Sequence, residues 1–248
     1  EARKGQLEAI FITHAHEDHV GAVAHYYARL GAPIHARAFT ANIARRKMQE
    51  HGNPEKAVHI ASTWPATVKA GPFTVGFVPI SHSIPESSGL VIDSAGGRIV
   101  HTGDFKIDVN PVVGEPFDVF SHHEGRSEST VGGPITDLVA ASKGLFVCTT
   151  FASNVARVKS LAEAGVRAGR SVCLMGRAMQ RMIEAAQETG VLTGFPKTIS
   201  PEEAGNVPRD SLMLIVTGSQ GERRAASAQL ANGKYNGITL KDGDTFLF

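Results

Sequence analysis

The sequence predicts an α/β protein in two parts, a β-rich first part and a second part built on a parallel sheet. Short apolar runs bounded by turn residues alternate with helical patterns along the 248 residues, which is typical of packed strands and helices. After about residue 130 the pattern becomes three successive strand–helix units, which favour a parallel sheet covered by helices. The stretch 116–134 is polar and rich in Gly, Ser and His, so we place a boundary there, with domains at 1–128 and 129–248.

The first part is predicted to consist mainly of short strands. Residues 9–13 (Ala-Ile-Phe-Ile-Thr) form an apolar run typical of a buried strand, and residues 73–79 alternate like a half-buried one. Two later runs flank Ser-Ala-Gly-Gly at 94–97, which predicts a β-hairpin with a glycine-rich turn. The predicted order is strand 9–13, helix 20–30, strand 33–36, helix 40–51, strand 73–79 and hairpin strands 89–93 and 98–102.

The second part is predicted to repeat one strand–helix unit. Each unit begins with a short, continuous apolar run, as expected for a strand buried on both faces. The predicted strands are 144–150, 171–176 and 211–217, and the helices that follow them are 154–168, 179–189 and 222–231.

Composition narrows the class of protein. Hydrophobic residues make up 42% and charged residues 20%, which is ordinary for a globular protein. A net charge of +1 does not mark a nucleic-acid binder, although it leaves room for a local basic groove. We expect no membrane span and no secretory signal, because no long apolar run is present. Cys148 and Cys173 lie in apolar runs, which favours buried thiols in the cytoplasm over a disulfide between neighbouring strands.

The strongest chemical signal follows the first predicted strand. Residues 13–19 (Thr-His-Ala-His-Glu-Asp-His) hold four potential metal ligands within six positions. Zinc prefers imidazole nitrogen and carboxylate oxygen, and a catalytic site leaves a position open for water. A loop leaving a strand turns His14 and His16 to one side, so that Asp18 and His19 face a second ion. The segment therefore predicts a metal site rather than a set of isolated surface or core histidines.

This spacing resembles the signature of the metallo-β-lactamase superfamily. Two later segments agree with it: His82 directly follows a predicted strand, and Asp104 ends a predicted hairpin. The resemblance implies two zinc ions, one held by His14, His16 and His82 and the other by Asp18 and His19, with Asp104 bridging them. It also implies catalytic roles for Asp18, which orients the attacking water, and for Asp104.

Within that superfamily the chain resembles the ribonuclease J family of β-CASP nucleases. The resemblance implies a partial metallo-β-lactamase domain of the αββα type and a partial β-CASP domain with a parallel α/β fold. It further implies a zinc-dependent ribonuclease with endonuclease and 5′-to-3′ exonuclease activity in RNA decay and maturation, and a homo-oligomer at full length. The matching segments are 14–19 (His-Ala-His-Glu-Asp-His), 82–86 (His-Ser-Ile-Pro-Glu), 101–108 (His-Thr-Gly-Asp-Phe-Lys-Ile-Asp), 150–154 (Thr-Phe-Ala-Ser-Asn), 176–179 (Gly-Arg-Ala-Met) and 217–222 (Thr-Gly-Ser-Gln-Gly-Glu).

Two of the later segments join a strand to a helix, where free backbone N–H groups suit a phosphate. RNA contacts are therefore expected at Ser153, Asn154, Ser219 and Gln220. The alternative is plain helix capping, by Ser153 or Asn154 on one helix and by Ser219 on the other. Arginines are also candidate phosphate clamps, although an arginine on a helix is usually solvated. They are Arg157, Arg177, Arg181, Arg223 and Arg224.

The chain also departs from the family pattern. Only 13 residues precede the first histidine, no acidic residue can be assigned to the family's Asp-Ser-Thr-Asn segment near 117–126, and the family's later histidines are absent. We therefore expect a chain incomplete at both ends, with a weak second zinc site, that degrades RNA more poorly than an extended version. Two other hypotheses stay open: a small-molecule hydrolase such as a thioesterase or lactonase, and an inactive fragment that binds RNA or a partner.

Overall fold

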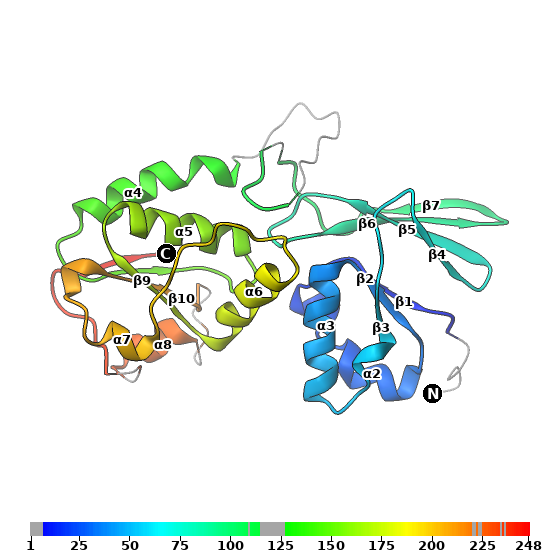
Figure 1. Ribbon diagram of the computed structural model, residues 1–248, viewed down its shortest axis with the longest axis horizontal. Helices are drawn as coiled ribbons and strands as arrows, with labels where there is room; N and C mark the ends of the chain where they lie inside the picture. The colour runs from blue at the N-terminus through cyan, green and yellow to red at the C-terminus, as the bar shows by residue number, and fades with distance from the viewer. Residues whose placement is uncertain are drawn as a thin grey trace. The chain divides into compact units, whose positions relative to one another are not determined.

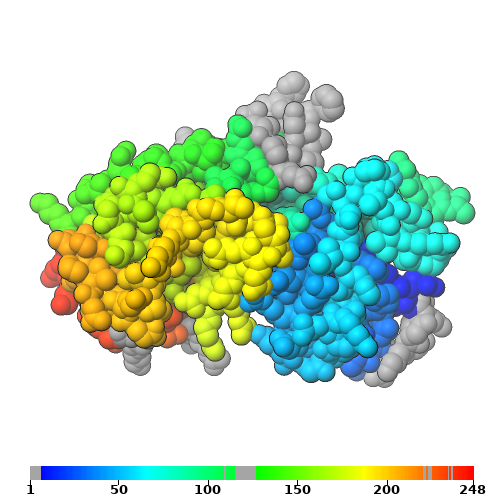
Figure 2. Space-filling model, in the orientation of Figure 1, coloured from blue at the N-terminus to red at the C-terminus, as the bar shows by residue number. Residues whose placement is uncertain are grey.

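The computed structural model describes residues 7–108, 110–114, 127–219, 222, 225–233, 235 and 237–248. The chain forms two compact units (Figures 1 and 2), and each is described by itself. The first unit comprises Glu1–Gly125 and Ala185–Val191, and the second comprises Arg126–Glu184 and Leu192–Phe248. The expected shortening near residues 117–126 falls outside the described residues.

The first unit begins with a small parallel sheet in the order β1-β2-β3. Its strands are short, and Ile34 and Ala36 of the central strand are fully buried. α3 packs on β2 and β3 and buries Phe39 and Met48 completely. The elements are β1 (Ile10–Ile12), α1 (Glu17–Val20), α2 (Val23–Leu30), β2 (Ile34–Ala36), α3 (Ala38–Glu50), a 3-10 turn (Glu55–Ala57) and β3 (Val58–Ile60).

An antiparallel sheet in the order β4-β5-β6-β7 completes the first unit. Its strands are β4 (Thr67–Ala70), β5 (Phe73–Pro79), β6 (Ser88–Ser94) and β7 (Gly97–His101). Ser94 pairs with Gly97 at the tip of the last hairpin, where Gly97 has a φ of 122°, so the predicted glycine-rich hairpin is confirmed. Phe77 of β5 is fully buried and lies 6.1 Å, ring to ring, from Phe11 of β1. The two sheets of this unit thus share an apolar core.

The second unit is built on a four-stranded sheet in the order β11-β8-β10-β9. Every neighbouring pair is parallel, which confirms the predicted parallel sheet. The three longer strands are buried almost throughout, because helices lie on both faces (Figure 1). The elements are a 3-10 turn (Glu128–Thr130), α4 (Gly132–Ala141), β8 (Phe146–Thr149), α5 (Val155–Arg167), β9 (Ser171–Met175), α6 (Arg177–Glu188), α7 (Pro201–Ala204), a 3-10 turn (Arg209–Ser211), β10 (Leu212–Val216), α8 (Ala226–Ala231) and β11 (Thr245–Leu247).

Arg170 supports this sheet from inside. Arg170 is 5% exposed. Its guanidinium donates hydrogen bonds to backbone carbonyls just before β8 and to one backbone carbonyl in β10. The distances are 2.6 Å to Ser142, 2.7 Å to Gly144 and 3.1 Å to Leu212. Burial lowers the pKa of Arg170 from its ordinary value. One charged group thus satisfies several buried carbonyls between elements far apart in sequence.

The structure corrects several predicted elements. The helix expected over 20–30 is α2, which begins at Val23, and the short helix α1 lies in the segment expected as a loop. The helix expected over 222–231 begins only at Ala226. β3, β4 and α4 were not predicted, since the strands are three and four residues long and α4 opens with Gly-Gly-Pro. Cys148 and Cys173 are buried and free, as predicted. Within the described ranges, no helix has the length and apolar character that crossing a membrane requires.

Candidate metal centre

The loop that leaves β1 carries the first candidate ligands. Thr13 and His14 follow the strand directly and are buried, with His14 fully enclosed. α1 then forms a single turn in which the backbone N–H groups of His19 and Val20 donate to the carbonyl of His16, at 3.0 and 2.9 Å. This turn brings His19 back beside His14, with their ring centroids 3.9 Å apart.

Three imidazoles meet at the first group of candidate ligands. His82 lies just after β5, and its ring centroid is 5.0 Å from that of His14 and 4.7 Å from that of His16. The third pair, His14 and His16, is 4.8 Å apart, and each pair of rings is nearly perpendicular. One nitrogen from each ring lies within 4.8 Å of the others, so a single ion can be reached by all three.

A second group contains His14, His19 and Asp104, whose ligand atoms also lie within 4.8 Å of one another. Oδ2 of Asp104 is 3.4 Å from Nε2 of His19 and 4.0 Å from Nε2 of His14. Asp18 is at the edge of this group, with its Oδ2 3.6 Å from Nε2 of His19 and its side chain 78% exposed. His14 belongs to both groups, whereas the sequence interpretation gave it to one ion only.

Burial keeps the rings of His14, His16 and His82 neutral near pH 7. Burial, reinforced by the neighbouring imidazoles, lowers the pKa of His14 to about 3 and that of His16 to about 4. Burial also lowers the pKa of His82, although Asp104 opposes the shift. Neutral imidazole is the form that binds metal. Nε2 of His14 is buried with no hydrogen-bond partner among the described residues, so this nitrogen fits the role of a metal ligand. The cluster is therefore compatible with metal binding.

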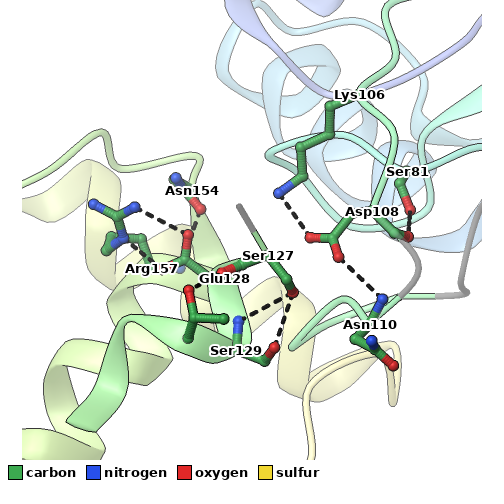
Figure 3. A network of polar contacts seen from close by, with 10 residues as sticks. Ser81, Lys106, Asp108, Asn110, Ser127, Glu128, Ser129, Asn154 and Arg157 are labelled. Atoms are coloured by element: carbon green, nitrogen blue, oxygen red, sulfur yellow. Dashed lines mark hydrogen bonds and ion pairs between the residues drawn. The ribbon is translucent and has the colours of Figure 1, made fainter. Parts of the chain in front are cut away.

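A polar network joins the loop of His82 to the segment of Asp104 (Figure 3). The backbone N–H of Lys106 donates to the carbonyl of Ser81 at 2.7 Å, and Oγ of Ser81 donates to the carbonyl of Asp108 at 3.2 Å. Nζ of Lys106 lies 3.0 Å from Oδ2 of Asp108, whose side chain is 1% exposed. Sequence reasoning missed Ser81 and did not single out Asp108, which was only the last residue of a matching segment.

Glu86 anchors the other end of the His82 loop. Its carboxylate accepts hydrogen bonds from Nη2 of Arg37 at 3.0 Å and from the backbone N–H of Phe39 at 2.5 Å, at the start of α3. Glu86 has a φ of 53°, a left-handed conformation that costs free energy in a non-glycine residue. A cavity of about 230 Å³ lies here, with Arg37, His82 and Glu86 among its lining residues. The loop is thus held at both ends.

At the start of α5 the structure shows a helix cap. Oδ1 of Asn154 accepts the backbone N–H of Arg157 at 3.1 Å, which is the capping alternative for this residue. The guanidinium of Arg157 is paired with the buried carboxylate of Glu128 through two hydrogen bonds (Figure 3). This pairing makes Arg157 a poor candidate for a phosphate clamp. The backbone carbonyl of Ser153 accepts a hydrogen bond from the backbone N–H of Val155 at 2.9 Å.

Ser219 does not cap the last helix, so the capping alternative is wrong for this residue. α8 begins at Ala226, whose N–H donates to Oγ1 of Thr217 at 3.4 Å. Oγ of Ser219 is instead buried, with no hydrogen-bond partner in the described part of the chain. The side chains of three further candidates lie outside the described residues: Gln220, Arg223 and Arg224.

The comparisons with known proteins agree with this arrangement. The model of the beta-lactamase superfamily domain matches residues 1–128, more than half of the chain, which defines the class of protein. The model named "Ribonuclease J, beta-CASP domain" matches residues 143–248. The chain therefore belongs to the beta-lactamase superfamily, and its second part matches the β-CASP domain of ribonuclease J. The predicted resemblance and fold class are both confirmed.

Individual relatives support the same assignment. The chain is 36% identical to a ribonuclease J of Sinorhizobium meliloti and 34% identical to one of Mycolicibacterium smegmatis, over 99% and 100% of its length. The alignments cover 47% and 48% of those proteins, so the chain spans about half the length of the curated relatives it matches. A crystal structure of a protein of unknown function from Enterococcus faecalis V583 has a TM-score of 0.56 at 16% identity, over 86% of this chain and 59% of that one. That likeness concerns the fold alone.

Proposed function

We propose that this protein is a zinc-dependent ribonuclease that hydrolyses phosphodiester bonds of RNA, by endonucleolytic and 5′-to-3′ exonucleolytic cleavage, in RNA decay and maturation. One observation carries the proposal: a cluster of imidazoles and a carboxylate lies in a chain whose second part matches a ribonuclease J β-CASP domain. The homo-oligomer and the cytoplasmic location expected from the sequence belong to the same proposal.

Two zinc ions are proposed at the cluster. His14, His16 and His82 would hold one ion, Asp18 and His19 would hold the other, and Asp104 would serve as a ligand to both. Support comes from the two overlapping ligand groups and from the orphan Nε2 of His14. Zinc supplies Lewis-acid chemistry when bound, since it lowers the pKa of water and offsets negative charge on phosphate oxygens.

Two carboxylates are the proposed catalytic residues. Asp104 is half exposed and lies within 4.0 Å of two imidazoles, so it can accept a proton from water or orient it. Asp18 is largely exposed, and its position beside His19 leaves a carboxylate oxygen available to orient the attacking water. The RNA contacts proposed at Ser153, Asn154, Ser219 and Gln220 rest on the resemblance. The cap at Asn154 weakens that proposal for its side chain.

The experiment compares the rates of hydrolysis of several substrates by one preparation of the protein, expressed from its complete gene. Elemental analysis of parent and His16→Ala protein is followed by time courses on a 5′-monophosphorylated, labelled RNA and on a model thioester and a model lactone. We expect zinc in the parent, a lower content in the variant, and cleavage of RNA only. Thioester or lactone turnover without RNA cleavage would establish the small-molecule hydrolase instead. RNA binding without any hydrolysis would support the inactive binding protein.

A further inference from the structure

A single hydroxyl group contacts two of the candidate ligands. Oγ1 of Thr13 lies 3.0 Å from Nδ1 of His14 and 3.5 Å from Nδ1 of His19. Thr13 is 6% exposed, so water does not compete freely for these contacts. The two contacts meet the rings on the side opposite Nε2, and Nε2 of both rings faces Oδ2 of Asp104.

The hydrogen-bonding capacity of these groups restricts the tautomers. A hydroxyl oxygen accepts two hydrogen bonds but donates only one, and a neutral imidazole has one N–H and one lone pair. If Thr13 donated to either Nδ1, that ring would carry its proton on Nε2 and could not bind an ion there. Only when both Nδ1–H groups donate to Thr13 do both rings present an Nε2 lone pair. Metal-binding histidines commonly donate their other N–H to such a partner.

We infer that Thr13 is a positioning residue that orients His14 and His19 together and selects the tautomer with the lone pair on Nε2 in each. The inference rests on the metal centre proposed above. One hydroxyl then links His14, which belongs to both ligand groups, with His19, which belongs to the second. Loss of that hydroxyl weakens metal binding through two ligands at once.

The local structure makes Thr13 suitable for this role. Its carbonyl accepts the backbone N–H of Ser88 at 3.0 Å, which holds the end of β1 against the start of β6. A β-branched side chain on a held backbone has few χ1 rotamers, so its oxygen stays in one place. Valine has nearly the same shape without the hydroxyl, and serine keeps the hydroxyl with more rotational freedom.

The first test measures zinc affinity by competition with a chromophoric chelator. Thr13→Val is expected to lower the affinity by about 10- to 100-fold, the usual cost of losing a partner of a metal-bound histidine. Thr13→Ser is expected to retain most of it. Thr40→Val is the matched control, because Thr40 is also buried and its hydroxyl has no hydrogen-bond partner among the described residues. Unchanged affinity in Thr13→Val overturns the inference.

A second measurement does not depend on the variants folding. Long-range ¹H–¹⁵N spectra of the zinc-loaded parent protein report which nitrogen of each histidine carries the proton. We expect Nδ1–H on both His14 and His19, and an Nε2–H on either ring overturns the inference. Failure of the metal centre itself is distinguishable: the parent would then bind no zinc, or His14→Ala would bind it as tightly as the parent does.

Discussion

The backbone N–H of Lys106 donates a 2.7 Å hydrogen bond to the carbonyl of Ser81. Ser81 precedes His82, and Lys106 follows Asp104 by two residues. This hydrogen bond therefore joins the two chain segments that contain His82 and Asp104, which belong to different ligand groups. Oγ of Ser81 adds a bond to the carbonyl of Asp108. Hydrogen bonds of the backbone as well as of the side chains therefore hold the two ligand groups at their spacing.

Replacing Lys106 with Met should destabilise the protein, because the buried carboxylate of Asp108 loses its cation. We expect a loss of about 1–2 kcal/mol, less than for a fully buried pair, because the Lys106 side chain is 38% exposed. Urea unfolding measures the change. The double variant Lys106→Met with Asp108→Asn should recover part of the loss. If it is no more stable than the single variant, the ion pair is not the cause.

The Glu86 carboxylate and its backbone conformation can be separated by two substitutions. Glu86→Ala loses the hydrogen bonds to Arg37 and Phe39 and keeps the strained φ, whereas Glu86→Gly loses the bonds and relieves the strain. We expect both variants to unfold more easily than the parent, with the glycine variant the more stable by about 1 kcal/mol. Both should also bind zinc more weakly, since His82 is on the same loop. Parent-like zinc affinity in both variants would show that Glu86 does not hold the His82 loop in place.

Asp244 should make stability depend on pH. Burial alone would raise its pKa, but hydrogen bonds from the backbone of Lys241 at 2.7 Å and Leu145 at 2.9 Å, together with Arg209, lower it. A lowered pKa stabilises the folded state above the ordinary pKa, and that contribution disappears as pH falls through the folded-state value. Asp244→Asn should thus be less stable by about 2 kcal/mol at pH 7. The difference should shrink below about pH 4. A constant difference across the pH range contradicts this account.

Arg170→Met should be the most damaging of these substitutions. It leaves the buried carbonyls of Ser142, Gly144 and Leu212 without their donor, which costs about 3 kcal/mol or more in total. Arg170→Lys should recover only part, because one ammonium cannot replace both Nη1, which donates to Gly144 and Leu212, and Nη2, which donates to Ser142. Thermal unfolding followed by circular dichroism measures both. Equal stability of the Arg170→Lys variant and the parent would show that the several hydrogen bonds of the guanidinium are not needed for stability.

Prediction from sequence succeeded where one pattern dominates. The continuous apolar runs at β8, β9 and β10 are buried on both faces, so composition alone identifies them. α4 was missed because its opening Gly-Gly-Pro resembles a loop, and its packing overrides that preference. At the candidate metal centre, the residue types and their order were predicted from the sequence, and the structure brings His14, His16, His19, His82 and Asp104 together. The place of His14 in both groups and the contacts of Thr13 were not predicted, because they depend on how α1 turns back beside β1.

The strand order of the second unit has a consequence for its assembly. β10 pairs with β8 on one side and β9 on the other, so those two earlier strands never contact each other in the sheet. During synthesis on the ribosome, 66 residues (213 − 146 − 1) emerge after Phe146 before its partner Met213 appears. Until then two apolar strands have unpaired edges, a state that invites aggregation and slows folding. This part of the nascent chain is where we expect molecular chaperones to bind.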